Sequence, residues 1–124
     1  MKTGRPTNLN LFSIKWPVTA LVSITHRISG ILLFLATALL LYLLDLSLAS
    51  EDGFMQAGEL LSTPAASFVV WLTVAALLYH LIAGCRHLLM DIGIGETWRA
   101  ARFAAAAVIV LSVIGAILAG LWIW

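Results

Sequence analysis

This sequence carries very little charge. Only 10% of its 124 residues are Asp, Glu, Lys or Arg, whereas 62% are hydrophobic and the mean hydropathy is +1.05. Soluble globular domains usually carry about 25% charged residues, so a soluble globular fold is excluded. The apolar content also excludes a disordered chain, because disordered chains are poor in apolar residues.

Cysteine is almost absent as well. The single cysteine, Cys85, excludes an intrachain disulfide and any multi-cysteine metal site. Because Cys85 stands in an apolar run, we expect it to be a small core residue. The first 17 residues lack the apolar segment of a signal peptide, so we expect the first apolar segment to be a span that stays in the protein.

Charge is missing altogether from three long segments, residues 28–44, 60–85 and 103–124. A membrane-spanning helix needs roughly 20 mainly apolar residues, and each segment is long enough. We therefore predict an all-α integral membrane protein with one domain, residues 1–124. Its three spans are predicted at approximately 21–48, 65–89 and 103–123, with a short amphipathic helix in the first loop at about 54–61.

The positions of the basic residues predict the orientation. All seven Lys and Arg residues lie before the first uncharged segment or between the second and the third. The loop between the first two spans has no basic residue but contains Glu51, Asp52 and Glu59. By the positive-inside rule, the N-terminus and the second loop are cytoplasmic and the C-terminus lies outside.

The first span begins with a polar face. A helix over residues 17–48 would be about 48 Å long, more than the roughly 30 Å hydrocarbon core. Its first turns are therefore predicted at the cytoplasmic interface. Helical spacing brings four residues to one face of these turns: Ser23, His26, Arg27 and Gly30.

Two interpretations of this face stay open. Arg27 could simply extend to the lipid headgroups, as arginines near helix ends do. Ser23 and His26 gain nothing from such an arrangement. The alternative is a polar recess that hydrogen-bonds a membrane-soluble ligand or an acidic cofactor group.

His80 is the second polar feature. It lies eleven residues before Asp91, so about 16 Å of helix separates it from the cytoplasmic end of its span. An ionisable residue at such depth is a functional candidate, and neutral imidazole is a common axial ligand of heme iron. Gly84, one turn later, would let a flat macrocycle approach the backbone. Alternatively, His80 only hydrogen-bonds a neighbouring helix and Gly84 only serves close packing.

The third feature continues the same stripe, because positions 80, 84, 87 and 91 share one helix face. His87 and Asp91 are expected closer to the cytoplasm than His80, level with the Arg27 face. They are candidates for carrying protons or binding heme propionates. For Arg86 beside them, we expect an interfacial salt bridge.

A heme held by two histidines needs ligands on opposite sides of the iron at one depth. His87 cannot share an iron with His80, because both project from the same face of one helix. We expect His26 near the cytoplasmic end, well above the depth of His80. A second histidine ligand would then have to come from another chain, which implies a partner subunit.

Three motifs in the chain resemble the signature of a known family. They are R-P-T-N-L at residues 5–9, S-I-T-H-R-I-S-G at 23–30 and H-L-I-A-G-C-R-H-L-L-M-D at 80–91. Together they resemble the cytochrome b subunit of succinate dehydrogenase, in its proteobacterial form. The resemblance covers essentially the whole chain, including the number and orientation of the spans.

The resemblance implies a membrane anchor of respiratory complex II in the bacterial inner membrane. There it would pair with a second small anchor subunit and, with it, hold an iron–sulfur subunit and a flavoprotein on the cytoplasmic face. Nucleic acid has no place among these partners. Electrons would pass from succinate to ubiquinone. The chain lacks a nucleotide-binding glycine motif and a multi-cysteine site, so succinate oxidation would take place in the other subunits and no catalytic residue is expected here.

The resemblance also implies roles for particular residues. Ser23 and Arg27 would bind ubiquinone, and His26 and Arg27 would lie near the propionates of a heme b. His80 would be one axial ligand of that heme, with the other from the second anchor. The remaining polar residues of the stripe would form a proton path: His87 and Asp91.

Three alternative functions remain open from the sequence. The first is the anchor of a quinol:fumarate reductase, which would share the fold and run mainly in reverse. The second is a structural or assembly subunit without a cofactor. The third is a small transporter, against which the sequence shows no inverted repeat and no acidic residue at a membrane midplane.

Overall fold

The computed structural model describes residues 15–124, which form four helices and no strand. The motif at residues 5–9 and the basic residues Lys2 and Arg5 lie outside the described residues. The helices are α1, Val18–Ala49; α2, Glu51–Leu61; α3, Pro64–Asp91; and α4, Trp98–Ile123.

Local sequence signals explain where these helices begin. Pro17 precedes α1 in an extended conformation and forms its N-cap, one position earlier than we expected for this proline. Side-chain oxygens cap the other three helices, as serine and threonine commonly do. The capping residues are Ser50 for α2, Thr63 for α3 and Thr97 for α4.

Three of the helices, α1, α3 and α4, are long and apolar enough to cross a membrane. This confirms the predicted all-α fold with three candidate spans. The fourth helix, α2, follows α1 directly and starts three residues before the amphipathic segment predicted at 54–61. Where the membrane boundaries lie along each helix stays a prediction.

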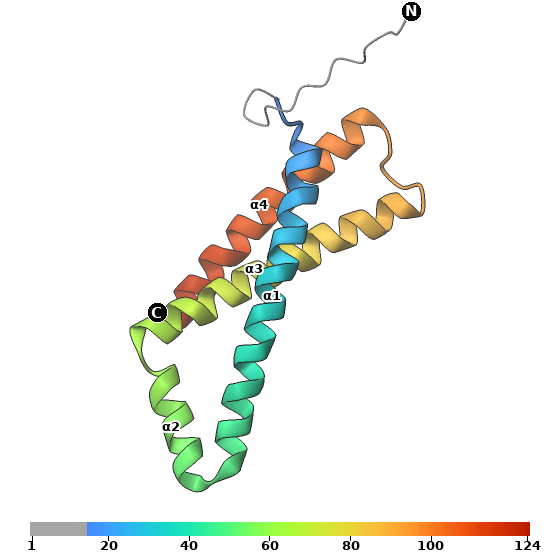
Figure 1. The fold of residues 1–124 in the computed structure, drawn as a ribbon. Helices are drawn as coiled ribbons and strands as arrows, with labels where there is room; N and C mark the ends of the chain where they lie inside the picture. Colours follow the sequence, from blue (N-terminus) through green and yellow to red (C-terminus); the bar gives the residue numbers. More distant parts are fainter. Residues whose placement is uncertain (1–14) are drawn as a thin grey trace, which may run out of the picture.

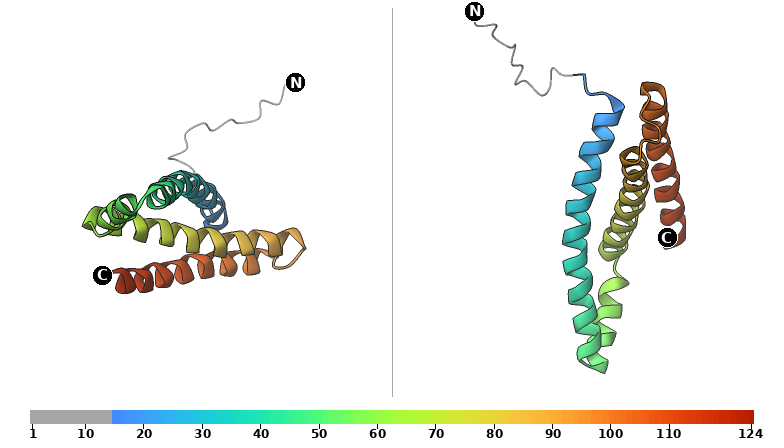
Figure 2. Two further views of the ribbon diagram at one scale, coloured as in Figure 1. Left: turned by 90° about the horizontal axis from the view of Figure 1, so that it is seen from below. Right: turned by 90° about the vertical axis from the view of Figure 1, so that its right-hand side faces the viewer.

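The helices pack as an antiparallel pair crossed by a third (Figures 1 and 2). α3 and α4 lie side by side in opposite directions, and α1 crosses them. α2 runs back beside the C-terminal half of α1 and leads into α3. A small core lies in the crossing region, formed by Val22 of α1, Ala83 of α3, and Ala105 and Val108 of α4.

Small residues allow α3 and α4 to approach closely. A Cβ at Gly115 of α4 would lie 3.0 Å from Leu78 Cδ1 of α3. The indole Nε1 of Trp71 donates to the backbone oxygen of Ala116 at 2.8 Å. Contacts of this kind are typical of membrane helices, where packing and hydrogen bonds hold helices together.

One expectation about the core is wrong. Cys85 is exposed rather than buried. The buried positions of this turn of α3 belong to Ala83 and Arg86. A membrane helix is apolar on all sides, both where it packs against another helix and where it faces lipid. The apolar run around Cys85 therefore could not show on which of these sides the cysteine lies.

Candidate functional site

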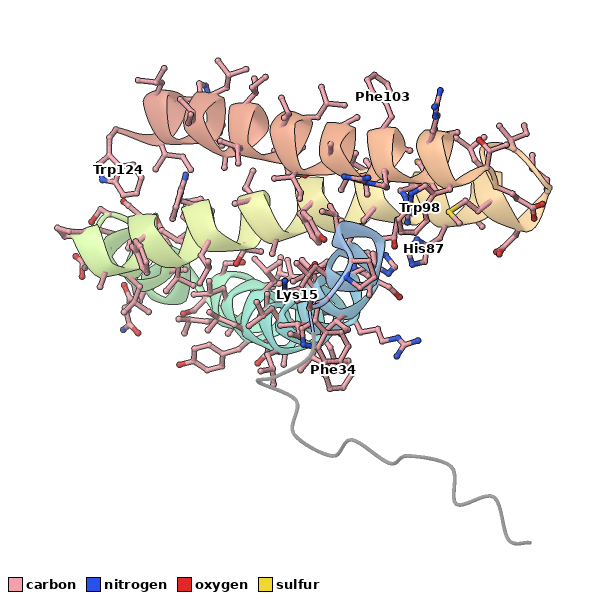
Figure 3. All side chains as sticks on the ribbon, turned by 90° about the horizontal axis from the view of Figure 1, so that it is seen from above. Lys15, Phe34, His87, Trp98, Phe103 and Trp124 are labelled. Atoms are coloured by element: carbon pink, nitrogen blue, oxygen red, sulfur yellow. The ribbon has the colours of Figure 1, made fainter. Side chains whose placement is uncertain are left out.

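All three histidines of the chain meet where α1 crosses α3. The His26 ring of α1 stacks on the His80 ring of α3, with centroids 4.1 Å apart and planes inclined by 18°. The His87 ring lies 5.0 Å from the His26 ring at 44°. Figure 3 shows His87 on the side of α3 that faces the N-terminal part of α1. The structure therefore makes one cluster, the histidine cluster, from residues of two helices.

Two glycines make room for this stacking. A Cβ at Gly84 of α3 would lie 3.4 Å from His26 Nε2, and a Cβ at Gly30 of α1 would lie 3.2 Å from His80 Cε1. Each glycine stands four residues after the histidine of its own helix. The imidazole of each helix thus lies over the glycine of the other. The space beside Gly84, which we assigned to a macrocycle, holds the His26 ring.

His80 is also held by hydrogen bonds to α1. Its Nδ1 lies 2.9 Å from Ser29 Oγ and 3.2 Å from the backbone oxygen of His26. Ser29 Oγ donates to that same backbone oxygen at 2.7 Å. Ser29 is only 5% exposed, so water does not compete for these bonds. One ring nitrogen of His80 is therefore tied to α1.

The expected depth of His26 is wrong. We placed it well above His80, but the two rings are stacked. His26 lies eight residues after the start of α1, and His80 lies eleven residues before the end of α3. That difference of three residues is only about 4.5 Å along a helix. Because α1 and α3 run in opposite directions, side chains easily close this gap.

Two stacked rings still cannot hold one heme between them, because face-to-face imidazoles leave no room for a macrocycle. That the second heme ligand comes from another chain therefore stays a prediction. The reason for this prediction is the stacking of His26 and His80, in place of a difference in depth.

Ser23 and Arg27 lie on α1 beside the histidine cluster. Ser23 is half-buried and Arg27 is exposed. Neither side chain is hydrogen-bonded within the part of the chain that the structure describes. One helical turn separates the two, so a hydroxyl and a guanidinium are both available to a ligand at this end of α1.

Arg86 differs from its expected role. It is only 7% exposed, and its Nη2 donates to the backbone oxygen of Ala101 in α4 at 3.5 Å. The interfacial salt bridge expected for it is therefore wrong. Its position one turn before Met90, on the side of α3 that faces α4, buries the side chain between the two helices. Its Nε finds no hydrogen-bond partner among the described residues.

Two nitrogens of the histidine cluster are likewise buried without a hydrogen-bond partner in the described chain: His26 Nε2 and His87 Nδ1. Asp91 is exposed at the last position of α3, one turn beyond His87. Buried polar atoms are nearly always paired in proteins, so the two nitrogens indicate that groups outside residues 15–124 complete the cluster.

Two polar contacts between α1 and α3 were not predicted from the sequence. One is the hydrogen bond between His80 Nδ1 and Ser29 Oγ. The other joins the hydroxyl groups of Thr25 and Tyr79, and Tyr79 Oη also donates to the backbone oxygen of Val22 at 3.2 Å. The spacing of positions 22, 26 and 29 places Ser29 on the same helix face as His26, which could have indicated a role for it. A serine in an apolar helix, however, commonly bonds only to its own backbone, so the spacing alone did not predict the contact with His80.

No group of three or more His, Cys, Asp or Glu residues is arranged to hold a bare metal ion in residues 15–124. The histidine cluster can therefore offer single nitrogen ligands and hydrogen-bond donors. A metal that already carries its other ligands in a macrocycle fits this set, since it needs only one nitrogen from this chain.

Comparisons with known proteins all point to the same family. A family model described as "Succinate dehydrogenase/Fumarate reductase transmembrane subunit" matches residues 1–119. A succinate dehydrogenase cytochrome b556 subunit of Coxiella burnetii is 43% identical over 125 residues, covering 100% of both chains. One from Rickettsia bellii is 32% identical over 96% of this chain and 91% of its own. A cytochrome b560 subunit from Marchantia polymorpha is 41% identical over 75% of this chain and 72% of its own.

The glycine beside His80 gives a direct test of the crossing. We expect Gly30→Val to push the His80 ring away and to lower the free energy of unfolding by about 1–3 kcal/mol, the usual cost of overpacking. The measurement is the thermal denaturation midpoint of the purified assembly. Gly58→Val is the matched control, because a Cβ at Gly58 meets nothing within 4 Å. Equal losses in both variants would contradict a close contact at Gly30.

Proposed function

The chain belongs to the family of succinate dehydrogenase/fumarate reductase transmembrane subunits, and from this membership we propose how its residues serve the complex. It is a multi-pass membrane-anchor subunit of succinate dehydrogenase, the respiratory complex II, and it does not oxidise succinate by itself. We propose that it binds one heme b together with a second anchor subunit and forms part of a ubiquinone site.

The observation that carries the heme proposal is the fixed His80 ring. Nδ1 is engaged by Ser29 and by the backbone of His26, so Nε2 is the nitrogen left for an iron atom. Histidine ligands of metals usually have their second nitrogen hydrogen-bonded in this way. When bound, the heme would accept and release single electrons. His80 would hold it at the level of the histidine cluster.

The free nitrogens of the cluster support the same proposal. His26 Nε2 is buried beside the proposed ligand and has no hydrogen-bond partner in the described part of the chain, and a heme propionate could accept a hydrogen bond from it. Arg27 would add a positive charge near the same carboxylates. His87 and Asp91 follow toward the end of α3 and would pass protons from the cytoplasm to the quinone.

Ser23 and Arg27 are the proposed ubiquinone ligands. A quinone has two carbonyl oxygens, which need hydrogen-bond donors most strongly as negative charge develops during reduction. The Ser23 hydroxyl and the Arg27 guanidinium are both donors without a described partner. Because they lie near the start of a long apolar helix, the quinone tail could stay in the lipid while its head group reaches them.

The complex that we propose contains three further subunits: a second membrane anchor, an iron–sulfur subunit and a flavoprotein. We propose the bacterial inner membrane as its location, with the N-terminus in the cytoplasm. The start of α1, the end of α3 and the start of α4 lie toward one end of the bundle, and α2 lies at the other end (Figure 1). Those three segments contain Arg27, Arg86, Arg99 and Arg102, whereas the charged residues of α2 are all acidic. This segregation supports the orientation through the positive-inside rule.

The anchor of a quinol:fumarate reductase is the alternative that the family name also covers. In such an anchor, the histidines and Arg27 would have the same roles, but electrons would flow mainly from quinol to fumarate. An anchor without a cofactor is less consistent with the histidine cluster, because three side-chain nitrogens of this region are buried without a partner among residues 15–124 and the acidic groups of a cofactor would pair with them.

The orientation is tested with reporter fusions. A periplasm-specific reporter placed after Trp124 should be active, and a cytoplasm-specific reporter in the loop at residues 92–97 should also be active. The reason is that every Lys and Arg lies before the first uncharged segment or between the second and the third, which is one side of the predicted membrane. The reverse pattern would overturn the orientation and move the quinone site to the other face.

The heme proposal is tested by two histidine substitutions in the assembled complex. His80→Ala should abolish or perturb the low-spin bis-histidine optical spectrum, because it removes the axial ligand. His87→Ala is the matched control within the cluster and should keep axial ligation. If ligation is lost in His87→Ala and retained in His80→Ala, the assignment of the ligand is wrong.

The quinone proposal is tested by Arg27→Leu. Loss of a charged hydrogen bond typically costs about 1.5–3 kcal/mol, which is roughly a 10- to 150-fold loss of quinone turnover or affinity. Succinate-driven ubiquinone reduction should fall by such a factor. Reduction of a soluble dye that accepts electrons before the quinone should survive. Ser23→Ala should show the same split with a smaller loss.

Arg99→Leu is the control for loss of a positive charge at this end of the bundle. Its ubiquinone reduction and its dye reduction should both stay unchanged. Activities are compared at equal content of assembled complex. If both activities of Arg27→Leu fall in proportion to assembled complex, Arg27 holds subunits together instead of binding quinone. If neither falls, Arg27 serves only to reach the lipid headgroups.

A further inference from the structure

We infer that Ser29 is a positioning residue for His80, which it holds in one tautomer with one ring orientation. The inference rests on the proposed function, in which His80 is an axial heme ligand. It adds a residue that the motif assignments leave without a role. The main observation behind it is that Ser29 Oγ lies 2.9 Å from His80 Nδ1 across the α1–α3 crossing, although the two residues are 51 positions apart in the sequence.

The direction of the hydrogen bonds follows from which atoms can donate. The backbone oxygen of His26 can only accept, and Ser29 Oγ donates its single proton to it at 2.7 Å. Ser29 Oγ can then only accept from His80. The same backbone oxygen lies 3.2 Å from His80 Nδ1 and again can only accept. Both contacts therefore require the proton of the neutral His80 ring to be on Nδ1.

This assignment leaves Nε2 of His80 with a free lone pair. A neutral imidazole carries one proton, so a proton on Nδ1 excludes one on Nε2. A hydrogen bond from Nδ1–H to a good acceptor also increases the donor strength of the opposite nitrogen toward a metal. Ser29 thus prepares the nitrogen that would bind iron.

The geometry around the ring supports positioning. Gly30 lies beside the His80 ring, where a Cβ would be 3.2 Å from Cε1, and the His26 ring stacks on it. These contacts limit how far the ring can tilt. Only the two acceptors on α1 fix its rotation about the axis of the side chain, and Ser29 Oγ is the closer of the two.

The test uses Ser29→Ala in the assembled complex, with Ser47→Ala as the matched control. Ser47 lies in the same helix, and its hydroxyl makes the same kind of bond to the backbone oxygen three residues earlier, at 2.8 Å. No histidine is bonded to Ser47. Both substitutions therefore remove one local serine bond of α1, and only Ser29→Ala removes an acceptor from His80.

The readouts are the midpoint potential of the heme and the electron paramagnetic resonance spectrum of its ferric form. Ser29→Ala should weaken His80 as a donor, which destabilises the ferric form relative to the ferrous form. A tenfold change in that ratio raises the potential by about 59 mV for a one-electron couple. The largest g value should also shift, because the ring can rotate. Ser47→Ala should leave both readouts at their wild-type values.

Ser29→Thr distinguishes positioning from simple packing. Threonine keeps the hydroxyl, so the wild-type potential and spectrum should return. If Ser29→Ala binds no heme, restored heme content in Ser29→Thr supports the inference, and equal heme loss in both variants overturns it. Wild-type potential and g values in Ser29→Ala would overturn it as well.

Failure of this inference is distinguishable from failure of the proposed function. If His80→Ala loses the bis-histidine spectrum while Ser29→Ala matches wild type, only the role of Ser29 is wrong. If His80→Ala keeps the spectrum, His80 is not a ligand, and the proposed heme site falls together with the role of Ser29.

Discussion

The contact between α1 and α3 at the paired histidines and glycines is the interaction on which the rest of the site depends. In lipid, helices gain nothing from burying apolar side chains against each other, so close packing and hydrogen bonds must hold them. Here, Gly30 and Gly84 remove side-chain bulk at the points where His80 and His26 approach. The same approach brings the hydroxyl of Ser29 to His80. One crossing thus supplies packing, hydrogen bonds and a fixed imidazole.

Buried charge places a second constraint on this end of the molecule. Arg86 is 7% exposed and reaches a single backbone oxygen, at 3.5 Å. Charged groups inside a membrane protein are costly and usually mark functional regions. Ser112 Oγ, His26 Nε2 and His87 Nδ1 are also buried without a partner among residues 15–124. Three of these four residues lie toward the end of the bundle where α1 begins and α3 ends, so most of the unpaired buried polar atoms of the described residues are at this end.

The sequence predicted the helices well, for a physical reason. Spans are read from long uncharged segments, and caps such as Ser50, Thr63 and Thr97 mark where helices begin. The three histidines that meet at the α1–α3 crossing were also singled out, because polar groups are conspicuous in an apolar chain; their roles stay predictions. What failed was the side on which a residue packs. Cys85 and Arg86 are neighbours in sequence, yet the cysteine is exposed and the arginine is buried.

The pairing of residues on different helices could not be predicted either. It depends on how α1 and α3 cross, and a helix that is apolar all round carries little information about its packed side. The depth of His26 illustrates this limit. Counting residues from the predicted membrane boundary put it well above His80, whereas counting from the observed helix ends gives a difference of only about 4.5 Å. The hydrogen bond between Ser29 and His80 follows from the same crossing, so it too appears only in the structure.

The faces of α1 explain how one short segment could serve two ligands. Val22, His26 and Ser29 face α3, whereas Arg27 is exposed on the neighbouring face. Thr25 lies one turn from Val22 and from Ser29 on the side of α1 that meets α3, where its hydroxyl contacts Tyr79. Because these faces belong to two consecutive turns of one helix, the proposed quinone donor and the support of the proposed heme ligand are held rigidly relative to each other. A shift of α1 against α3 would therefore change both sites together, while a substitution on one face can change one site alone.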